Sequence, residues 1–245
     1  MKTVIAGKRN FRQVNEDVRN SFDGNTQTVL LDVNGQRYLG CAMQNGCSLE
    51  IHGTPGNDMG SFLDGGTIEV FGNGQEAIGN TMNAGSITVH GHVGDTLGYA
   101  MRNGEIFVEK HAGSRAGIHM KEFEEMHPTV VIGGTAGAFL GEYMAGGTLI
   151  VLGLYNTANR NNVGIHCATG MHGGKIFVRG GVPSENVSEH ITACVPDSGD
   201  LAEIERLVGE YCKRFGADKD EIMSVPFTKL VPTTSRPYAN LYTPN

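Results

Sequence analysis

The sequence predicts an all-β protein: a right-handed parallel β-helix of about seven coils, each of roughly 19 to 20 residues. Glycine is the first indication, because 36 of the 245 residues are glycine, about twice the usual share. The second is a strand-like segment that recurs at nearly constant spacing, and the third is the group of turn glycines after each copy. Such a short strand cannot bury its apolar face alone, so successive coils must stack on one another.

The repeated segment starts with a glycine and continues with alternating branched residues. Its leading glycines are Gly46, Gly66, Gly85, Gly104, Gly147 and Gly174. The first three intervals are 20, 19 and 19 residues, and the 43 residues after Gly104 leave room for a further coil that starts at Pro128. Polar insertions at residues 121–127 and 155–162 explain the longer intervals. Residues 28–33, TVLLDV, are a candidate for the first coil.

A Gly-x-x-Gly-x-x-x-Gly motif follows the strand in three coils and is partly present in a fourth. The predicted turn glycines are Gly53, Gly56, Gly60, Gly91, Gly94, Gly98, Gly113, Gly117, Gly134, Gly137 and Gly141. Glycine suits such corners because they need a positive φ or a close approach to the next coil. Period-two alternation predicts an aliphatic core of Leu49 and Ile51, Ile68 and Val70, Ile87 and Val89, Ile106 and Val108, Leu149 and Val151, Ile176 and Val178.

Three segments are predicted along the chain. Residues 1–27 form an N-terminal cap with an amphipathic helix that starts after Asn10, residues 28–183 form the β-helix, and residues 184–245 form a C-terminal helix and an extended docking tail. The C-terminal helix places Leu201, Ile204, Leu207, Val208, Tyr211 and Phe215 on one face. The tail is extended because it contains Pro226, Pro232, Pro237 and Pro244. Caps are expected, since an open solenoid end leaves apolar residues and strand edges bare.

The outward residue of each strand forms a continuous column along the stack. The column reads Glu50, Glu69, Thr88, Phe107, Val131, Ile150 and Phe177. Its last four members are apolar and form the candidate interface, because a water-soluble protein normally covers such a patch. We expect the chain's own C-terminal helix to lie antiparallel or oblique across Phe107 to Phe177, and a partner subunit is the alternative cover. The two can coexist if the helix covers only part of the column.

Composition excludes several classes of protein. The chain has 19 Lys and Arg against 26 Asp and Glu, a net charge of −7, and no basic cluster, so nucleic acid and anionic membranes are poor partners. It has no long apolar run and no signal-peptide core, so we expect a soluble cytoplasmic protein. Five scattered cysteines without a Cys-x-x-Cys indicate free thiols rather than an iron–sulfur cluster or a zinc knuckle.

Two sequence patterns resemble binding or catalytic motifs, but a structural role explains each of them better. Gly72-x-Gly74-x-x-Ala77 resembles a dinucleotide-binding turn, but Gly79 arrives where that turn requires a helix. A carbohydrate-degrading β-helix would need outward acids, whereas the outer column turns apolar after two acids and the chain has no Trp. We therefore predict no catalytic and no cofactor-binding residue in this chain.

Two groups of residues contain histidine, alone or with glutamate, and both residue types can bind metals. They are His119, Glu122, Glu125 and His127 in the inserted loop, and His52 and His90 just before equivalent turn glycines. The loop matches no metal-binding spacing, which favours a solvated acidic loop. Period two turns His52 and His90 outward, which favours an exposed polar column. No metal-binding residue is predicted.

The repeated glycine motif resembles that of a known family. Over residues 29–181, with three full copies of the motif, the chain resembles the GXGXG β-helix that forms the C-terminal domain of the glutamate synthase large subunit. It also resembles the β-helical subunit of formylmethanofuran dehydrogenase. The resemblance to the stand-alone form of the glutamate synthase domain implies a non-catalytic scaffold subunit.

That resemblance also implies partners and their cofactors. The partners would be a glutamine amidotransferase subunit, which releases ammonia, and an FMN-binding glutamate synthase subunit that also carries an iron–sulfur cluster. No cofactor is expected in this chain itself. The alternatives are a subunit of an N-methylglutamate synthase and a subunit of a formylmethanofuran dehydrogenase-type complex.

Overall fold

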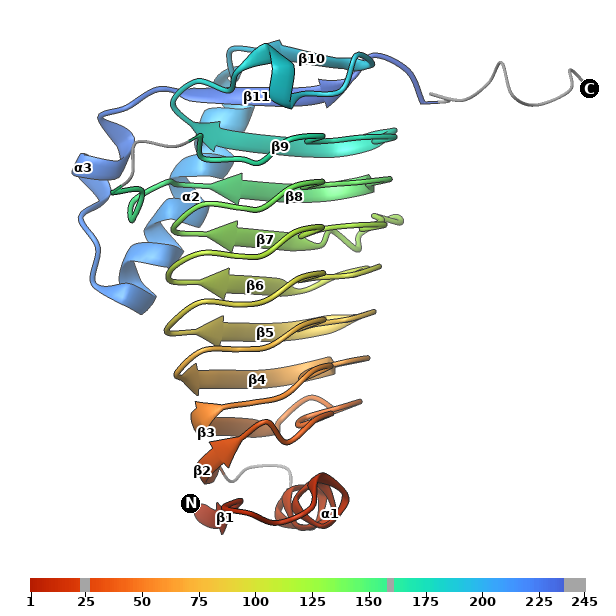
Figure 1. Cartoon of the computed structure of the whole chain (residues 1–245), viewed down its shortest axis with the longest axis vertical. Coiled ribbons are helices and arrows are strands. Elements are labelled where there is room, and N and C mark those ends of the chain that lie inside the picture. Colours follow the sequence, from red (N-terminus) through yellow and green to blue (C-terminus); the bar gives the residue numbers. More distant parts are fainter. Residues whose placement is uncertain (23–26, 158–160, 236–245) are drawn as a thin grey trace, which may run out of the picture.

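The computed structural model describes residues 1–22, 27–157 and 161–235. One sheet of eleven strands runs the length of the molecule in the order β1 to β9, then β11 and β10 (Figure 1). Every pair from β1 to β9 is parallel. The strands of this stack are β1 (Lys2–Ile5), β2 (Gln27–Asn34), β3 (Ser48–Thr54), β4 (Asp64–Phe71), β5 (Ala84–Val89), β6 (Glu105–Val108), β7 (Thr129–Ile132), β8 (Ala145–Val151) and β9 (Gly173–Arg179). The chain is therefore the predicted parallel β-helix.

The number of coils differs slightly from the prediction. The seven predicted repeats correspond to β3 through β9, and the candidate first coil lies in β2. Strand β1 pairs with β2 in parallel and was not predicted, because its four residues have no leading glycine and no turn motif after them. The segment expected to be only a helical cap thus also contributes a strand to the sheet.

The interior of the solenoid consists of stacked ladders of identical or similar side chains. Ile68 lies beside Ile87, which lies beside Ile106, and all twelve predicted core residues are buried. A second internal ladder lies after the turns and was not predicted: Met43, Leu63, Met82, Met101, Met120, Met144 and Met171. Methionine suits these positions because its unbranched, flexible side chain fills irregular spaces between coils.

Helix α1 (Phe11–Ser21) closes the first coil. The Asn10 side chain accepts a hydrogen bond from the Arg12 backbone N–H at 2.9 Å, which satisfies one of the unpaired amides of the first turn. Val14 and Val18 are buried against the core, and Phe22 packs there partly buried. The predicted helical spacing is therefore the face that meets the solenoid.

The C-terminal segment is more structured than a helix followed by a tail. It contains a short 3₁₀ helix (Ser184–Asn186), β10 (Ile191–Cys194), α2 (Ser198–Phe215), α3 (Lys219–Met223) and β11 (Phe227–Pro232). Strand β11 pairs antiparallel with β9, and β10 pairs antiparallel with β11, so part of the expected tail completes the chain's own sheet. Pro237 and Pro244 lie outside the described residues. None of the helices in the described ranges is long and apolar enough to cross a membrane.

Candidate functional site

The predicted turn glycines fall into two geometrical groups. A positive φ occurs at Gly53, Gly60, Gly98, Gly117 and Gly141. The others lie close to the neighbouring coil without a positive φ: Gly56, Gly91, Gly94, Gly113, Gly134 and Gly137. A Cβ atom at Gly137 would lie 2.7 Å from the Ser114 nitrogen, whereas at Gly94 its nearest neighbour, the Gln75 carbonyl carbon, would be 3.1 Å away. Close approach is therefore much tighter at Gly137 than at Gly94.

The outer apolar column is covered by the chain's own helix. Its four members, Phe107, Val131, Ile150 and Phe177, are all fully buried. They form one cluster with four residues of α2: Ile204, Leu207, Val208 and Tyr211. Leu201, expected on the same face, is instead 42% exposed. A partner at this place would meet the outer surface of α2 and not the column.

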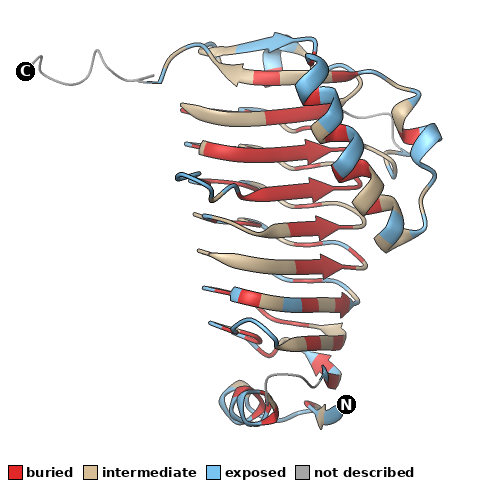
Figure 2. Cartoon of the chain, turned by 180° about the vertical axis from the view of Figure 1, so that it is seen from behind, coloured by how far each residue is buried: buried red, intermediate tan, exposed pale blue. Residues whose placement is uncertain are grey.

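Helix α2 runs opposite to the direction in which the coils accumulate. Its first turn lies at β9, where Asp200 accepts a hydrogen bond from Lys175. Its last turn lies at β5 and β6, where Arg214 contacts the hydroxyl of Ser86 and lies 4.0 Å from a carboxylate oxygen of Glu105. Figure 2 shows the helix crossing the strands obliquely.

An ionic network fixes the start of α2. Asp200 has a side chain only 1% exposed and accepts hydrogen bonds from Lys175 Nζ at 3.0 Å and Lys229 Nζ at 2.5 Å. Burial alone would raise the pKa of this carboxyl, but the two lysines lower the pKa to about 2. Asp200 therefore joins three segments, since Lys175 lies in β9 and Lys229 in β11.

The same network reaches the inserted loop through His127. Its Nδ1 lies 3.0 Å from Glu122 and its Nε2 lies 3.0 Å from the hydroxyl of Thr148, which donates to Glu203 at 2.6 Å. Interaction with Glu203 raises the pKa of His127, and interaction with His127, against burial, lowers the pKa of Glu203 to about 2. This arrangement anchors the loop to α2.

The structure separates the other candidates of that loop. His119 stacks on Tyr143 with ring centroids 5.3 Å apart, and Glu125 is exposed. Within the described ranges, no group of three or more His, Cys, Asp or Glu is arranged to hold a metal ion. After Gly74 the chain turns without forming a helix, so the dinucleotide-like pattern is a β-helix corner.

His52 and His90 face outward, and His90 packs edge-on against Phe215, the last residue of α2, with ring centroids 5.1 Å apart. The two histidines sandwich Phe71, with ring centroids 5.0 and 4.7 Å from it. Glu50 lies 2.6 Å from His52, and Glu69 lies 2.9 Å from His90. Thr88, Glu69 and Glu50 continue the apolar column toward β3, and His52, Phe71 and His90 form a second column beside it.

Two columns of rings on the coils between β5 and β9 were not predicted, and all their members except Phe139 are exposed. In the first, His119 stacks on Tyr143 and meets Tyr99 edge-on at 5.9 Å. In the second, Phe139 stacks on His166 at 4.9 Å and carries the Arg115 guanidinium at 4.8 Å. We call these six residues the corner columns.

Four residues of the corner columns share a sequence position relative to a turn glycine. Arg115 and His119 flank Gly117 by two residues on either side, and Phe139 and Tyr143 flank Gly141 in the same way. All four have φ between 53° and 60°. Their left-handed backbone turns the side chains outward at the same corner of each coil. Arg115, His119 and Tyr143 are exposed at these positions, and Phe139 is half-buried.

These features define a parallel β-helix with glycine corners whose outer apolar face is closed by a C-terminal helix. The sequence model of the GXGXG motif matches residues 2–234, so the chain belongs to the GXGXG motif family. It is 39% identical over 251 residues to the uncharacterized protein MJ1350 of Methanocaldococcus jannaschii, covering 99% of this chain and 96% of the relative.

A similar fold occurs in a solved structure of a complex. That structure is the formyltransferase/hydrolase complex (FhcABCD) of Methylorubrum extorquens with methylofuran. The matched chain gives a TM-score of 0.62 at 23% sequence identity, and the match covers 83% of this chain and 72% of that one. At this identity the likeness concerns the fold alone.

Proposed function

We propose that this chain is a non-catalytic scaffold subunit of a multi-subunit enzyme complex. The observation that supports it best is the pair of corner columns, in which three aromatic side chains, two histidines and one arginine stack on successive coils. Rings and arginines are enriched at protein interfaces because they contribute large contact areas at a small cost in conformational entropy.

The finer proposal is a split glutamate synthase-like complex. Membership of the GXGXG motif family and the resemblance of the turn motif to the stand-alone glutamate synthase domain support it. In this proposal a glutamine amidotransferase subunit supplies ammonia, and a separate synthase subunit holds FMN and an iron–sulfur cluster. This chain then binds no cofactor and positions the two catalytic subunits.

A second candidate has comparable support. The fold matches a chain of a formyltransferase/hydrolase complex over most of both lengths, which favours a formylmethanofuran dehydrogenase-type assembly. An N-methylglutamate synthase would use partners of the glutamate synthase kind. All three candidates share the scaffold role and differ in the catalytic partners.

Isolation of the native assembly tests the proposal. The full chain carries an affinity tag in its own host, and the purified material is examined by native mass spectrometry and absorption spectroscopy. Flavin, iron–sulfur absorbance and glutaminase activity support the glutamate synthase-like complex. A pterin-bound molybdenum or tungsten, or formyl transfer, supports the second candidate. A chain that purifies alone contradicts the scaffold role.

Variants of the corner columns make the test specific. We expect His119→Ala with Tyr143→Ala to lower partner retention without changing the melting temperature of the chain, because both side chains are exposed. Phe62→Ala is the matched control: Phe62 has the same place relative to Gly60 and is 52% exposed, but it belongs to a lower coil outside the corner columns. Equal retention in all variants contradicts the assignment of this surface.

A further inference from the structure

The N-terminal end of the solenoid has an open sheet edge. Strand β1 is the terminal strand of the sheet, and in the described part of the chain it pairs with β2 alone. The Ala6 N–H donates to the Leu31 carbonyl at 2.8 Å. Because backbone groups alternate between the two sides of a strand, those of Thr3 and Ile5 point away from β2. The Ile5 carbonyl indeed accepts a hydrogen bond from Arg9 Nη1 on the outer side, at 3.0 Å.

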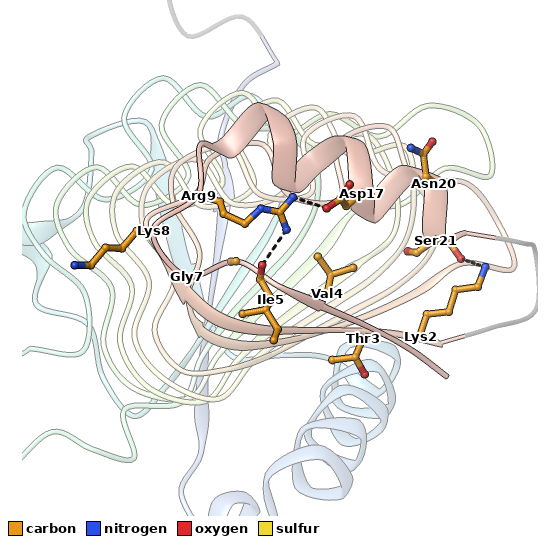
Figure 3. Close-up of a pocket in the computed structure, with 11 residues that line it drawn as sticks. Lys2, Thr3, Val4, Ile5, Gly7, Lys8, Arg9, Asp17, Asn20 and Ser21 are labelled. Atoms are coloured by element: carbon orange, nitrogen blue, oxygen red, sulfur yellow. Dashed lines mark hydrogen bonds and ion pairs between the residues drawn. The ribbon is translucent and has the colours of Figure 1, made fainter.

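A groove accompanies this edge. It has a volume of about 960 Å³ and lies between β1 and α1 (Figure 3). Its apolar lining includes Val4, Ile5 and Ala6. Of these, Ile5 is 57% exposed. An open edge beside an apolar groove is the geometry by which proteins bind an extended segment as an additional strand.

The charge at this end differs from that of the whole chain. Residues 1–22 contain five Lys and Arg but two acids, whereas the entire chain has a net charge of −7. Lys2, Lys8 and Arg9 line the groove, and Asp17 on its wall is paired with Arg9. Lys8 extends from the end of the strand toward solvent (Figure 3). This surface favours an acidic occupant.

A second copy of the chain fits this surface poorly. Two-fold pairing of β1 with β1 would bring the two basic ends together, and like charges across an interface are unfavourable. The outward backbone groups of Thr3, the outward N–H of Ile5 and the apolar lining favour a peptide over other polyanions, since a polyanion without a backbone of this kind cannot complete the strand ladder.

We propose that the edge of β1 binds an extended acidic segment of a partner subunit, which adds to the sheet as a further strand. Val4 and Ile5 contact its apolar side chains, and Lys2 and Lys8 face its carboxylates. This inference rests on the proposed role as a subunit of a complex and identifies the chemistry of one contact.

Peptide binding to the full chain tests the edge directly. The probe is a short fluorescein-labelled peptide that alternates glutamate and valine, and its lysine and valine counterpart is the charge control. Fluorescence anisotropy at low and high salt measures affinity, and hydrogen exchange measures protection of the Thr3 and Ile5 amides. We expect saturable, salt-sensitive binding of the glutamate peptide alone and slower exchange at both amides.

Two substitutions at one position isolate the backbone contribution. Thr3→Pro removes an outward N–H from an edge strand, where proline is tolerated, and Thr3→Ala removes the same side chain but keeps the N–H. We expect Thr3→Pro to bind the glutamate peptide about tenfold more weakly than Thr3→Ala. Circular dichroism melting verifies that each variant is folded.

A charge-reversing substitution just outside β1 tests the contribution of charge to peptide binding. Lys8→Glu should weaken glutamate-peptide binding about tenfold and reduce its salt dependence. If Thr3→Pro does not fold, this variant decides. Equal affinity of Thr3→Pro and Thr3→Ala, equal binding of the lysine peptide, unchanged affinity of Lys8→Glu, or no binding to the parent would each overturn the proposal. Isolation of a complex that lacks any contact at β1 would overturn it while leaving the scaffold role intact.

Discussion

The Tyr211 hydroxyl donates a hydrogen bond to the backbone carbonyl of Glu109 at 2.7 Å, across 102 residues of sequence. Tyr211 is fully buried and lies in α2, while Glu109 follows β6 directly. Gly133 lies beneath this contact, and a Cβ atom there would overlap both the Tyr211 hydroxyl and the Glu109 carbonyl oxygen. Because glycine has no side chain, Gly133 allows α2 to approach the solenoid this closely.

Tyr211→Phe should lower the free energy of unfolding by about 1 to 2 kcal/mol, because the Glu109 carbonyl loses its donor in a buried place. Urea unfolding followed by circular dichroism measures the change. Tyr38→Phe is the control: Tyr38 is 40% exposed and lies beside Phe11 of α1, away from α2, and we expect an effect below about 0.5 kcal/mol. Similar losses in the two variants would contradict the importance of the buried contact.

Gly137→Ala should destabilise the protein by more than Gly94→Ala. The added Cβ atom meets the Ser114 nitrogen at 2.7 Å in the first variant, but the closest atom is 3.1 Å away in the second. We expect a cost of about 2 to 4 kcal/mol at Gly137 and about 1 kcal/mol at Gly94. Neither glycine has a positive φ, so the pair measures close approach without backbone strain. Equal urea midpoints for the two variants would show that the coils can separate at no cost.

Asp200→Asn should lower stability at neutral pH by about 2 kcal/mol, because the folded pKa of about 2 lies below the ordinary value of 3.8. A carboxyl with a lowered pKa stabilises the fold above its unfolded pKa and loses this contribution as the pH falls toward its folded pKa. The difference between parent and variant should therefore shrink between about pH 4 and pH 2. Glu205→Gln, an exposed acid of the same helix, is the control. A difference that is constant with pH would contradict the network.

A chain that ends at Gly181 should aggregate and bind a hydrophobic dye. The truncation removes α2, which covers Phe107, Val131, Ile150 and Phe177, and it also removes β11 from the edge of β9. Apolar patches and bare strand edges both promote association. Sedimentation and dye fluorescence measure the result. Leu207→Ala in the full chain is the milder variant, with an expected loss of about 2 to 4 kcal/mol. A truncated chain that remains monomeric and equally stable would show that the helix does not protect the column.

The regular parts of the molecule could be predicted because each residue in them obeys a local rule. The alternation in IEV and ITV identifies Ile68 and Ile87 as inward residues, and the constant spacing places them side by side in the sheet. The outward column could be predicted from the same alternation and spacing. Strand β1 could not be predicted, since its pairing with β2 depends on a contact and not on a repeated pattern.

The sequence by itself determined the repeat, the glycine corners, the inward ladders and the amphipathic caps, because period, composition and spacing are local properties. Only the tertiary structure decided how the ends close: α2 covers the apolar column, β11 completes the edge of β9, and β1 leaves an edge open. The corner columns and the Asp200 network were likewise decided by the tertiary structure. They join residues far apart in sequence, and the free energy of such contacts depends on which surfaces meet when the coils stack and the chain turns back along them.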